Sequence, residues 1–375
     1  MKILLIAVNA KYIHSNLAVY SLQAYARQQG EEVSLREFTV NQQEDEILRE
    51  IYREKPDVAA FSVYIWNVEY VRRLAADLHA VLPETAVWFG GPEVSFDARK
   101  VMEELPFLSG ILIGEGEAAF AGLCRCLREK TPRQQRKIPG LLYREADGSL
   151  ADTGEAHPLP MDELPFPCGE LKYFRNRIIY YESSRGCPFS CTYCLSSLDR
   201  KLRYRSLELV FRELSFFLEK KVRQVKFVDR TFNADRERAA AIWRFLRERD
   251  NGVTNFHFEI EAELLDERGL SELAGMRPGL VQLEIGVQTT NQNTLAAIRR
   301  HMDFEKLARN VRTVRGLANI HQHLDLIAGL PEEDLESFAE SFREVYALRP
   351  QQLQLGFLKV LKGTPMAGEK KKWEI

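Results

Sequence analysis

The chain has 375 residues, of which 45% are hydrophobic and 28% are charged. At roughly 150 residues per domain this length suggests two to three domains, and the composition is globular rather than disordered, collagen-like or coiled-coil. Lys and Arg total 52 against 54 Asp and Glu, which gives a formal net charge of −2. This balance argues against broad electrostatic binding of nucleic acid.

The N-terminal segment MKILLIAVNAKY is followed by no small-residue cleavage site, so we expect it to be a strand rather than an export signal. A run of about 18 apolar residues, the length of a membrane helix, occurs nowhere in the sequence. Six cysteines in a long chain without an export signal indicate a reducing compartment, where clustered thiols bind metal more often than they form disulfides. We therefore expect a cytoplasmic protein without a membrane segment.

Residues 1–129 alternate short apolar runs with segments of helical spacing. Strands are expected at Lys2–Val8, Val33–Phe38, Val58–Tyr64, Ala86–Phe89 and Gly110–Ile113. Strand and helix in alternation predict a doubly wound parallel sheet covered on both faces. Ligands of such sheets bind beyond the carboxyl ends of the strands. Several loops there carry glycine, which lets a backbone approach a ligand but serves tight turns equally well.

Residues 130–173 break this pattern with basic and then Pro-rich sequence, and we interpret them as a connector with one hairpin at Asp147-Gly148. A second alternating series fills residues 174–366, and the short charged tail, 367–375, suggests a truncated chain. Its strands are expected near 178–183, 222–228, 255–261, 280–287, 320–328 and 352–358. This series predicts a partial (β/α)6 TIM-like barrel with its active face at the carboxyl ends of the strands.

The most specific motif follows the first barrel strand, where Cys187, Cys191 and Cys194 form a CxxxCxxC run. Three soft thiolates so close together suit one 4Fe–4S cluster, and three ligands for four irons leave one iron open to a substrate or cofactor. The alternatives are a zinc site completed by a distant His and three ordinary reduced thiols. Structural zinc sites usually pair two CxxC motifs, and the sequence has no second pair. The remaining cysteines, Cys124, Cys126 and Cys168, are expected to be inert buried thiols.

The motif, with an aromatic residue before its last Cys and a six-stranded barrel after it, resembles the radical S-adenosylmethionine superfamily. The run Glu182-Ser183-Ser184-Arg185-Gly186-Cys187-Pro188-Phe189 is similar to the cobalamin-dependent members, which place a cobalamin-binding domain before the barrel. The resemblance implies that S-adenosylmethionine chelates the open iron. It also implies that an electron from the cluster, supplied by an external donor such as flavodoxin or ferredoxin, generates a 5′-deoxyadenosyl radical.

The same resemblance implies S-adenosylmethionine contacts at the ends of successive barrel strands, although the family's Gly-Gly-Glu triplet is absent. The residues expected to contact this cofactor are Tyr193, Asp229, Asn233, Glu259, Glu261, Glu284, Gln288 and Gly329. For Tyr193 the alternative is simple loop packing, and for Glu259 and Glu261 it is a buried salt bridge to an Arg. His321 and His323, at the start of the fifth strand, are expected to be structural.

Cobalamin is expected at the loops that follow the first five strands. The candidate residues are Asn9, Ser62, Tyr64, Trp66, Gly90, Gly91, Gly114, Glu115 and Gly116. The family's Asp-x-His-x-x-Gly motif is absent after the first strand, so cobalamin is expected to bind without a protein His ligand. His14 is an offset candidate for that ligand.

The resemblance implies methyl transfer to an unactivated carbon of a small-molecule or natural-product substrate. Cyclisation, oxidation or rearrangement by the same radical is the alternative. From another class comes an iron–sulfur electron-transfer or metal-binding module. Methylthiolation of tRNA is not expected, because the scattered cysteines lack the spacing of a second three-cysteine cluster.

Overall fold

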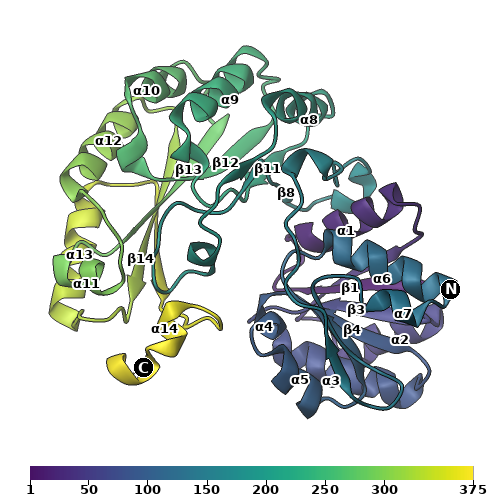
Figure 1. Cartoon of the computed structure of the whole chain (residues 1–375). Helices are drawn as coiled ribbons and strands as arrows, with labels where there is room; N and C mark the ends of the chain where they lie inside the picture. Colours follow the sequence, from purple (N-terminus) through teal and green to yellow (C-terminus); the bar gives the residue numbers. More distant parts are fainter. Residues whose placement is uncertain (375) are drawn as a thin grey trace. The chain divides into compact units, whose positions relative to one another are not determined.

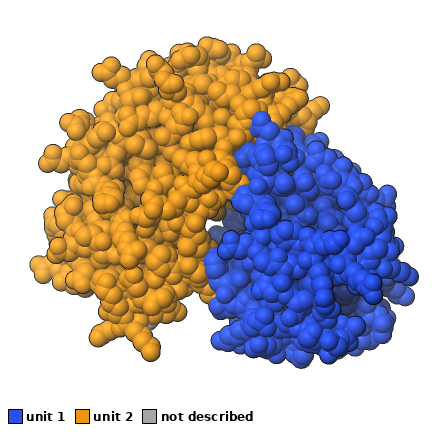
Figure 2. All heavy atoms as spheres, in the orientation of Figure 1, with its two compact units in different colours: residues 1–179 blue, residues 180–375 orange. Residues whose placement is uncertain are grey.

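The computed structural model describes residues 1–374, and the chain splits into two compact units, residues 1–179 and residues 180–375 (Figure 2). Both units are built from strands that alternate with helices (Figure 1). No helix among the described residues is both long enough and apolar enough to cross a membrane.

The first unit is a seven-stranded sheet in the order β2-β1-β3-β4-β5-β6-β7. Strands β1 to β5 run parallel, whereas the hairpin β6–β7 joins β5 in antiparallel sense. The strands are β1 (Ile3–Asn9), β2 (Ser34–Thr39), β3 (Val58–Ser62), β4 (Ala86–Gly90), β5 (Leu108–Leu112), β6 (Leu141–Arg144) and β7 (Leu150–Asp152). The hairpin expected near Asp147-Gly148 therefore forms, and it extends the first sheet.

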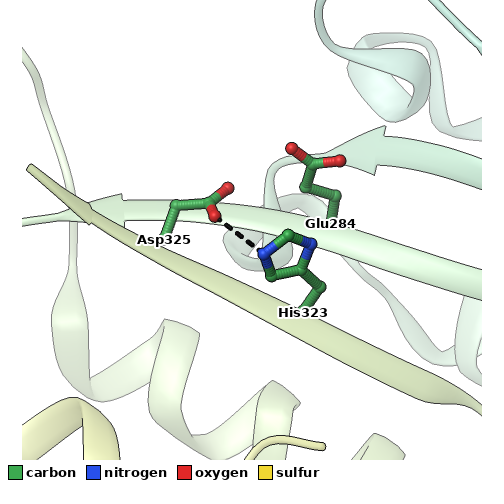
Figure 3. A group of neighbouring side chains, drawn as sticks. All are labelled: Glu284, His323 and Asp325. Carbon is green, nitrogen blue, oxygen red and sulfur yellow. Dashed lines mark ion pairs between the residues drawn. The ribbon is translucent and has the colours of Figure 1, made fainter. Parts of the chain in front are cut away.

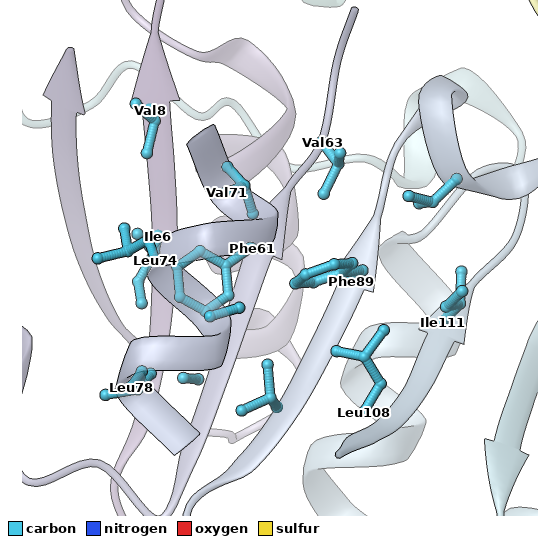
Figure 4. Close-up of a cluster of buried hydrophobic side chains, with 14 of the residues drawn as sticks. Ile6, Val8, Phe61, Val63, Val71, Leu74, Leu78, Phe89, Leu108 and Ile111 are labelled. Carbon is cyan, nitrogen blue, oxygen red and sulfur yellow. The ribbon is translucent and has the colours of Figure 1, made fainter. Parts of the chain in front are cut away.

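Helices cover both faces of this sheet, which is why its central strands are apolar throughout. All seven residues of β1 are buried. Figure 4 shows helix α3 laying Val71, Leu74 and Leu78 over Phe61 and Phe89, whose rings meet edge to face at 5.9 Å. The helices of the unit are α1 (Leu17–Gln28), α2 (Glu44–Glu54), α3 (Val68–Val81), α4 (Pro92–Ser95), α5 (Ala98–Glu104), α6 (Glu117–Glu129) and α7 (Pro132–Gln135).

The strand order reverses between β1 and β3, because β2 lies on one side of β1 and β3 to β5 follow on the other. In open parallel sheets, ligands bind at such a reversal, outside the carboxyl ends of the strands. The loops after β1 and β3 meet at this point. The predicted residues Asn9 and Ser62 end these two strands, and Tyr64 and Trp66 lie in the loop after β3.

The second unit is a six-stranded sheet in the order β15-β14-β13-β12-β11-β8, parallel from β11 to β15. Its strands are β8 (Ile179–Tyr181), β11 (Gln224–Phe227), β12 (Asn255–Ile260), β13 (Val281–Gln288), β14 (His321–Ala328) and β15 (Gln352–Phe357). A two-stranded ribbon pairs β9 (Ser184–Arg185) with β10 (Arg203–Tyr204). The doubly wound sheet and the partial barrel are both confirmed as the fold class.

Helices α8 to α13 follow the barrel strands, and Figure 1 shows α8, α9, α10 and α12 along the outer side of the sheet. Their bounds are α8 (Leu207–Glu219), α9 (Arg236–Glu248), α10 (Glu267–Ala274), α11 (Gln292–Ala297), α12 (Phe304–Gly316) and α13 (Leu335–Ala347), followed by α14 (Pro365–Gly368) and α15 (Lys370–Trp373). Short polar residues start several of them: Asp235, Asp266 and Asp303 each accept a hydrogen bond from a backbone N–H of the first turn.

The barrel strands are amphipathic, unlike β1. In β13 the residues alternate between buried and partly exposed along all eight positions. Val281, Leu283, Ile285 and Val287 are buried, whereas the opposite face carries Gln282, Glu284, Gly286 and Gln288. Because successive side chains of a strand point to opposite faces, the second set lies on the inner face of the barrel. We call this inner face the lumen.

A buried ion pair joins Glu213 of helix α8 to Arg205, and a hydrogen bond joins Glu213 to β8. The carboxylate of Glu213 accepts hydrogen bonds from Arg205 at 2.9 Å and from the hydroxyl of Tyr181 at 2.7 Å, and all three side chains are buried.

Removing one partner of a buried pair leaves the other charge without compensation. We expect Glu213→Gln to lower the free energy of unfolding by about 3–5 kcal/mol, measured by urea denaturation.

The matched control is Glu340→Gln, which removes one partner of the exposed ion pair between Glu340 and Arg343. Exposed pairs contribute roughly 0–1 kcal/mol, so this variant should unfold almost like the unmodified chain. Equal losses in the two variants would contradict a special role for the buried pair.

Candidate functional site

The three predicted cysteine ligands lie in one loop between β9 and the 3-10 turn Leu195–Leu198. All three are free thiols; Cys187 and Cys191 are buried and Cys194 is partly buried. The backbone of Gly186 has φ +92°, and a Cβ there would lie 2.5 Å from the carbonyl oxygen of Lys201. Only glycine fits this turn, which brings Cys187 into the loop.

Backbone hydrogen bonds tie this cysteine loop to distant parts of the second unit. Thr192 N donates to Ile298 O at 2.9 Å, and Met366 N donates to Thr192 O at 3.0 Å. Tyr193 packs against the small apolar cluster of Ile298, Leu330 and Met366, and burial raises the pKa of its hydroxyl. The loop is thus fixed by the end of helix α11 and by the C-terminal segment.

Asp229, at the end of β11, holds the segment that leads into the loop. Its carboxylate accepts hydrogen bonds from Ser183 N at 3.0 Å, Ser183 Oγ at 2.7 Å and Ser184 Oγ at 2.5 Å. Burial raises the pKa of Asp229, and these donors act in the opposite direction. Two residues on, Thr231 Oγ1 lies 3.6 Å from Cys187 Sγ. The structure therefore places Asp229 behind the cysteine loop with its oxygens already engaged.

Arg300 is the residue that sequence analysis missed. It follows helix α11, and its side chain is largely buried, only 10% exposed, with Nη1 at 3.9 Å from Cys191 Sγ and Nη2 at 2.8 Å from Glu261 Oε2. It also donates to the carbonyl oxygen of Gly286 at 2.5 Å. Burial raises the pKa of the Cys191 thiol, and the charge of Arg300 opposes that rise. The signal in the sequence was Glu261, for which a buried Arg partner was the stated alternative.

Four buried polar atoms around this loop find no hydrogen-bond partner within residues 1–374. They are Thr192 Oγ1, Glu261 Oε1, Gln288 Oε1 and Arg300 Nε. An unsatisfied buried polar atom costs roughly 1–3 kcal/mol, so a group of four beside free thiols is typical of a site completed by a polar ligand. The atoms include both acceptors and a donor, which suits a ligand with charged and hydroxyl groups.

The other residues predicted to contact S-adenosylmethionine lie in two separate groups. Asn233 stays with the cysteine loop region, because its side chain donates to Glu261 O and accepts from Glu261 N, both at 2.9 Å. Gln288 ends β13 after a register shift against β14, and its backbone has φ +70°, which is rare for a residue with a side chain. Gly329, with φ +84°, follows β14.

Glu259 and Glu284 belong to a separate polar group in the lumen. Lys226 Nζ lies 2.7 Å from Glu284 Oε2 and 3.3 Å from Glu259 Oε1. His257 Nε2 lies 2.8 Å from Glu284 Oε2. Burial alone would raise the pKa of Glu284, but His257 and Lys226 outweigh it and hold that pKa at about 2. His323, which was expected to be structural, faces Glu284 and Asp325 (Figure 3).

In the first unit, a buried carboxylate organises the loop after β1. Glu37 accepts hydrogen bonds from Asn9 Nδ2 at 2.9 Å, Asn16 N at 2.8 Å and the hydroxyl of Tyr20 at 2.5 Å, and it pairs with Arg177. Asn16 Nδ2 in turn donates to Ser62 Oγ at 3.1 Å. The predicted residues Asn9 and Ser62 therefore fix the loops of β1 and β3 to one another.

Large apolar side chains stand exposed along the same edge of the sheet. They come from the loops after β1 and β3 and from the end of helix α4, and they are Tyr12, Ile13, Ile65, Trp66 and Phe96. Trp66 stacks on Tyr64 with ring centroids 4.3 Å apart. Apolar groups gathered at a ligand-binding edge are typical of a site for a large apolar ligand.

The glycines of this edge bring backbone segments close together. Gly91 has φ +115°, and a Cβ there would lie 2.4 Å from the carbonyl oxygen of Val63, in the loop after β3. Gly90 ends β4, whereas Gly114, Glu115 and Gly116 form the turn between β5 and α6. All the predicted residues of the first unit thus lie at the carboxyl edge of its parallel strands.

Comparison with known families divides the chain in the same way. Residues 3–124 match the B12 binding domain family, and residues 181–345 match the Radical SAM superfamily.

Several curated proteins are similar over most of this chain. An uncharacterized methyltransferase of Pyrococcus horikoshii is 27% identical over 77% of this chain and 62% of its own length. The cobalamin-dependent radical SAM methyltransferase TokK of Streptomyces tokunonensis is 27% identical over 83% of this chain and 48% of its own length. An anaerobic magnesium-protoporphyrin IX monomethyl ester cyclase of Rubrivivax gelatinosus is 23% identical over 80% and 56%. The chain thus spans about half the length of these relatives.

Solved structures share the fold. The radical S-adenosylmethionine methyltransferase TsrM of Kitasatospora setae, with cobalamin and a [4Fe-4S] cluster bound, aligns with a TM-score of 0.79 at 18% identity, over 99% of this chain and 75% of that one. The cobalamin-dependent S-adenosylmethionine radical enzyme OxsB aligns with a TM-score of 0.78 at 19% identity, over 100% of this chain and 62% of that one.

Proposed function

The chain combines a B12-binding domain with a radical SAM domain, and from this pairing we propose that it is a methyltransferase acting on an unactivated carbon of a small molecule. The observation that carries the proposal is the cysteine loop, where three free thiols lie among four unsatisfied buried polar atoms. We take residues 1–129 as the cobalamin-binding part, 130–173 as the connector, 174–366 as the radical SAM part and 367–375 as its tail.

Cys187, Cys191 and Cys194 would hold a [4Fe–4S] cluster. When bound, a cluster with one iron free of protein ligands supplies the electron for reductive cleavage of S-adenosylmethionine. The protein's own contribution is electrostatic. Arg300 places a buried positive charge 3.9 Å from Cys191 Sγ, where it stabilises thiolate and added electron density.

S-Adenosylmethionine would be held by the unsatisfied atoms around the loop. Glu261 Oε1 is an acceptor for an ammonium or ribose hydroxyl, and Arg300 Nε is a donor for a carboxylate. Tyr193 offers an apolar surface beside the loop for the adenine. The ordering of Asn233 against Glu261 keeps the carboxylate in position, and Gly329 leaves room at the end of β14.

Cobalamin would be held at the carboxyl edge of the first sheet, and a methyl group carried on its cobalt is the chemistry it supplies. The exposed side chains of Tyr12, Ile65 and Trp66 suit the apolar face of a corrin. The glycine turns at Gly90-Gly91 and Gly114–Gly116 leave backbone accessible to its amide groups. We propose that no His of this chain ligates the cobalt.

The substrate and the electron donor are part of the same proposal. Related proteins are named for a carbapenam carboxylate and for a hopanoid, which are small molecules. We propose a small-molecule or natural-product substrate, a flavodoxin or ferredoxin as donor, and a cytoplasmic location. A second candidate, ring formation or oxidation without methyl transfer, is favoured by the similarity to the magnesium-protoporphyrin cyclase over 80% of the chain.

The cluster assignment predicts which thiols matter. Anaerobically reconstituted protein should hold about four irons and, when reduced with S-adenosylmethionine, should release 5′-deoxyadenosine. The variant with Cys187→Ala, Cys191→Ala and Cys194→Ala should lose both, whereas Cys168→Ala should keep both, because that thiol is buried in the other unit. Iron analysis measures the cluster content, and chromatography measures the released 5′-deoxyadenosine. Cleavage without a methylated product, judged by product mass, would favour the second candidate.

The corrin assignment predicts a role for an exposed aromatic. Trp66 is 47% exposed, so Trp66→Ala should leave the fold intact and weaken cobalamin binding about tenfold, measured by absorbance titration. The control is Tyr52→Ala. Tyr52 is 44% exposed but lies in the last turn of α2, toward the opposite edge of the sheet. Similar affinity in both variants would contradict the placement of the corrin at Trp66.

The electrostatic role of Arg300 predicts a change in potential. We expect Arg300→Gln to lower the reduction potential of the reconstituted cluster by roughly 50 mV, about 1 kcal/mol for one electron, because a cationic donor beside a ligand sulfur is lost. The control, Arg299→Gln, alters the neighbouring side chain, which is 58% exposed and pairs with Glu369. A potential that moves equally in both variants, followed by redox titration, would contradict this role.

A further inference from the structure

The polar group in the lumen consists of Lys226, His257, Glu259, Glu284, His323 and Asp325, and we call it the lumen cluster. Its members come from four adjacent strands, β11 to β14. The register of these strands brings the side chains together. Glu284 is the direct neighbour of His323 across β13 and β14, and Asp325 is two residues further along the same face of β14.

Three members of the lumen cluster converge on one point. Glu284, His323 and Asp325 each present a ligand atom, and these atoms all lie within 4.8 Å of one another (Figure 3). His323 Nε2 is 3.1 Å from Asp325 Oδ1, yet neither atom makes a hydrogen bond within the described residues. The side chain of His323 is only 7% exposed. A buried imidazole that pairs with one carboxylate and lies beside a second places nitrogen and oxygen donors together, which is the donor set of many metal sites (Figure 3).

The carboxylate of Glu284 is already oriented by its neighbours. Lys226 Nζ at 2.7 Å and His257 Nε2 at 2.8 Å both approach the same oxygen, Oε2. The other oxygen is therefore the one available to a ligand. Groups that hold one oxygen of a carboxylate while the other binds metal are the usual outer shell of a metal site.

The charges of the lumen cluster favour an added cation. Its three carboxylates face the ammonium of Lys226, which is shared between Glu259 and Glu284, and the charge of Arg230 also acts on Glu259. Among residues 1–374, the one ion-pair partner of Asp325 is the imidazole of His323. Buried carboxylates are stable when paired with cations or bound to metals. One divalent ion beside Asp325 would supply positive charge to this group of carboxylates.

We propose that Glu284, His323 and Asp325 bind a divalent transition-metal ion such as Mn²⁺ or Zn²⁺. One imidazole and two carboxylates form a donor set suited to these ions. Three protein ligands leave coordination positions open toward the lumen. If the proposed function holds, a substrate with adjacent oxygen or nitrogen donors would fill them. Glu284 is then a metal ligand rather than a contact of S-adenosylmethionine.

The experiment uses full-length protein with its cluster reconstituted, so that the cysteine thiols are occupied. After loosely bound iron is removed with a mild chelator, Mn²⁺ alone is titrated anaerobically and followed by EPR. We expect one Mn²⁺ per chain. His323→Gln and Asp325→Asn, which preserve side-chain size, should each weaken binding at least tenfold. Thermal melting of each variant establishes that it is folded.

The matched control is His301→Gln, which changes an exposed imidazole of the same unit and should bind Mn²⁺ like the unmodified protein. Absence of a stoichiometric Mn²⁺ signal, or unchanged binding in both His323→Gln and Asp325→Asn, would overturn the metal site. Release of 5′-deoxyadenosine is measured in parallel. If 5′-deoxyadenosine is still released but Mn²⁺ does not bind, the metal site alone is contradicted. If Mn²⁺ binds but no 5′-deoxyadenosine is released, the proposed function alone is contradicted.

Discussion

The second unit depends on one buried guanidinium. Arg300 joins the cysteine loop, the end of β12 and the middle of β13 by contacting Cys191, Glu261 and the carbonyl oxygen of Gly286. A buried arginine keeps its positive charge, and it is stable only where its partners supply hydrogen-bond acceptors. The strand ends and the loop are therefore fixed to each other without any bound group, and the unsatisfied atoms around them stay in position for one.

Much of this architecture followed from the sequence. The alternation of apolar runs and helical segments predicted both parallel sheets. In the first sheet helices on both faces leave the strands little polar surface, whereas in the second the polar face of the strands lines the lumen. The cysteine spacing predicted three thiols in one loop, where the structure has them. The hairpin at Asp147-Gly148 was predicted, but not its addition to the first sheet, since pairing partners distant along the chain leave no local signal.

Side-chain partners were harder to predict than strands. Parity indicated that Glu259 and Glu284 face the lumen, but the ammonium of Lys226, which they share, comes from a third strand. Arg300 lies 39 residues from Glu261 along the chain, beyond any pattern in the sequence. His323 was expected to be structural because it starts a strand, although its two-residue spacing from Asp325 was the available signal that both face the same way.

Gln288 shows a tension between folding and function. Its left-handed backbone, just after the register shift in β13, costs of order 1–3 kcal/mol for a residue that carries a side chain. A glycine would relieve that strain, but it would also delete an amide whose oxygen is buried and unsatisfied. Selection for stability alone would therefore favour replacing glutamine at this position. If an evolving lineage retains the glutamine, the reason is that its side chain serves a bound molecule rather than the fold.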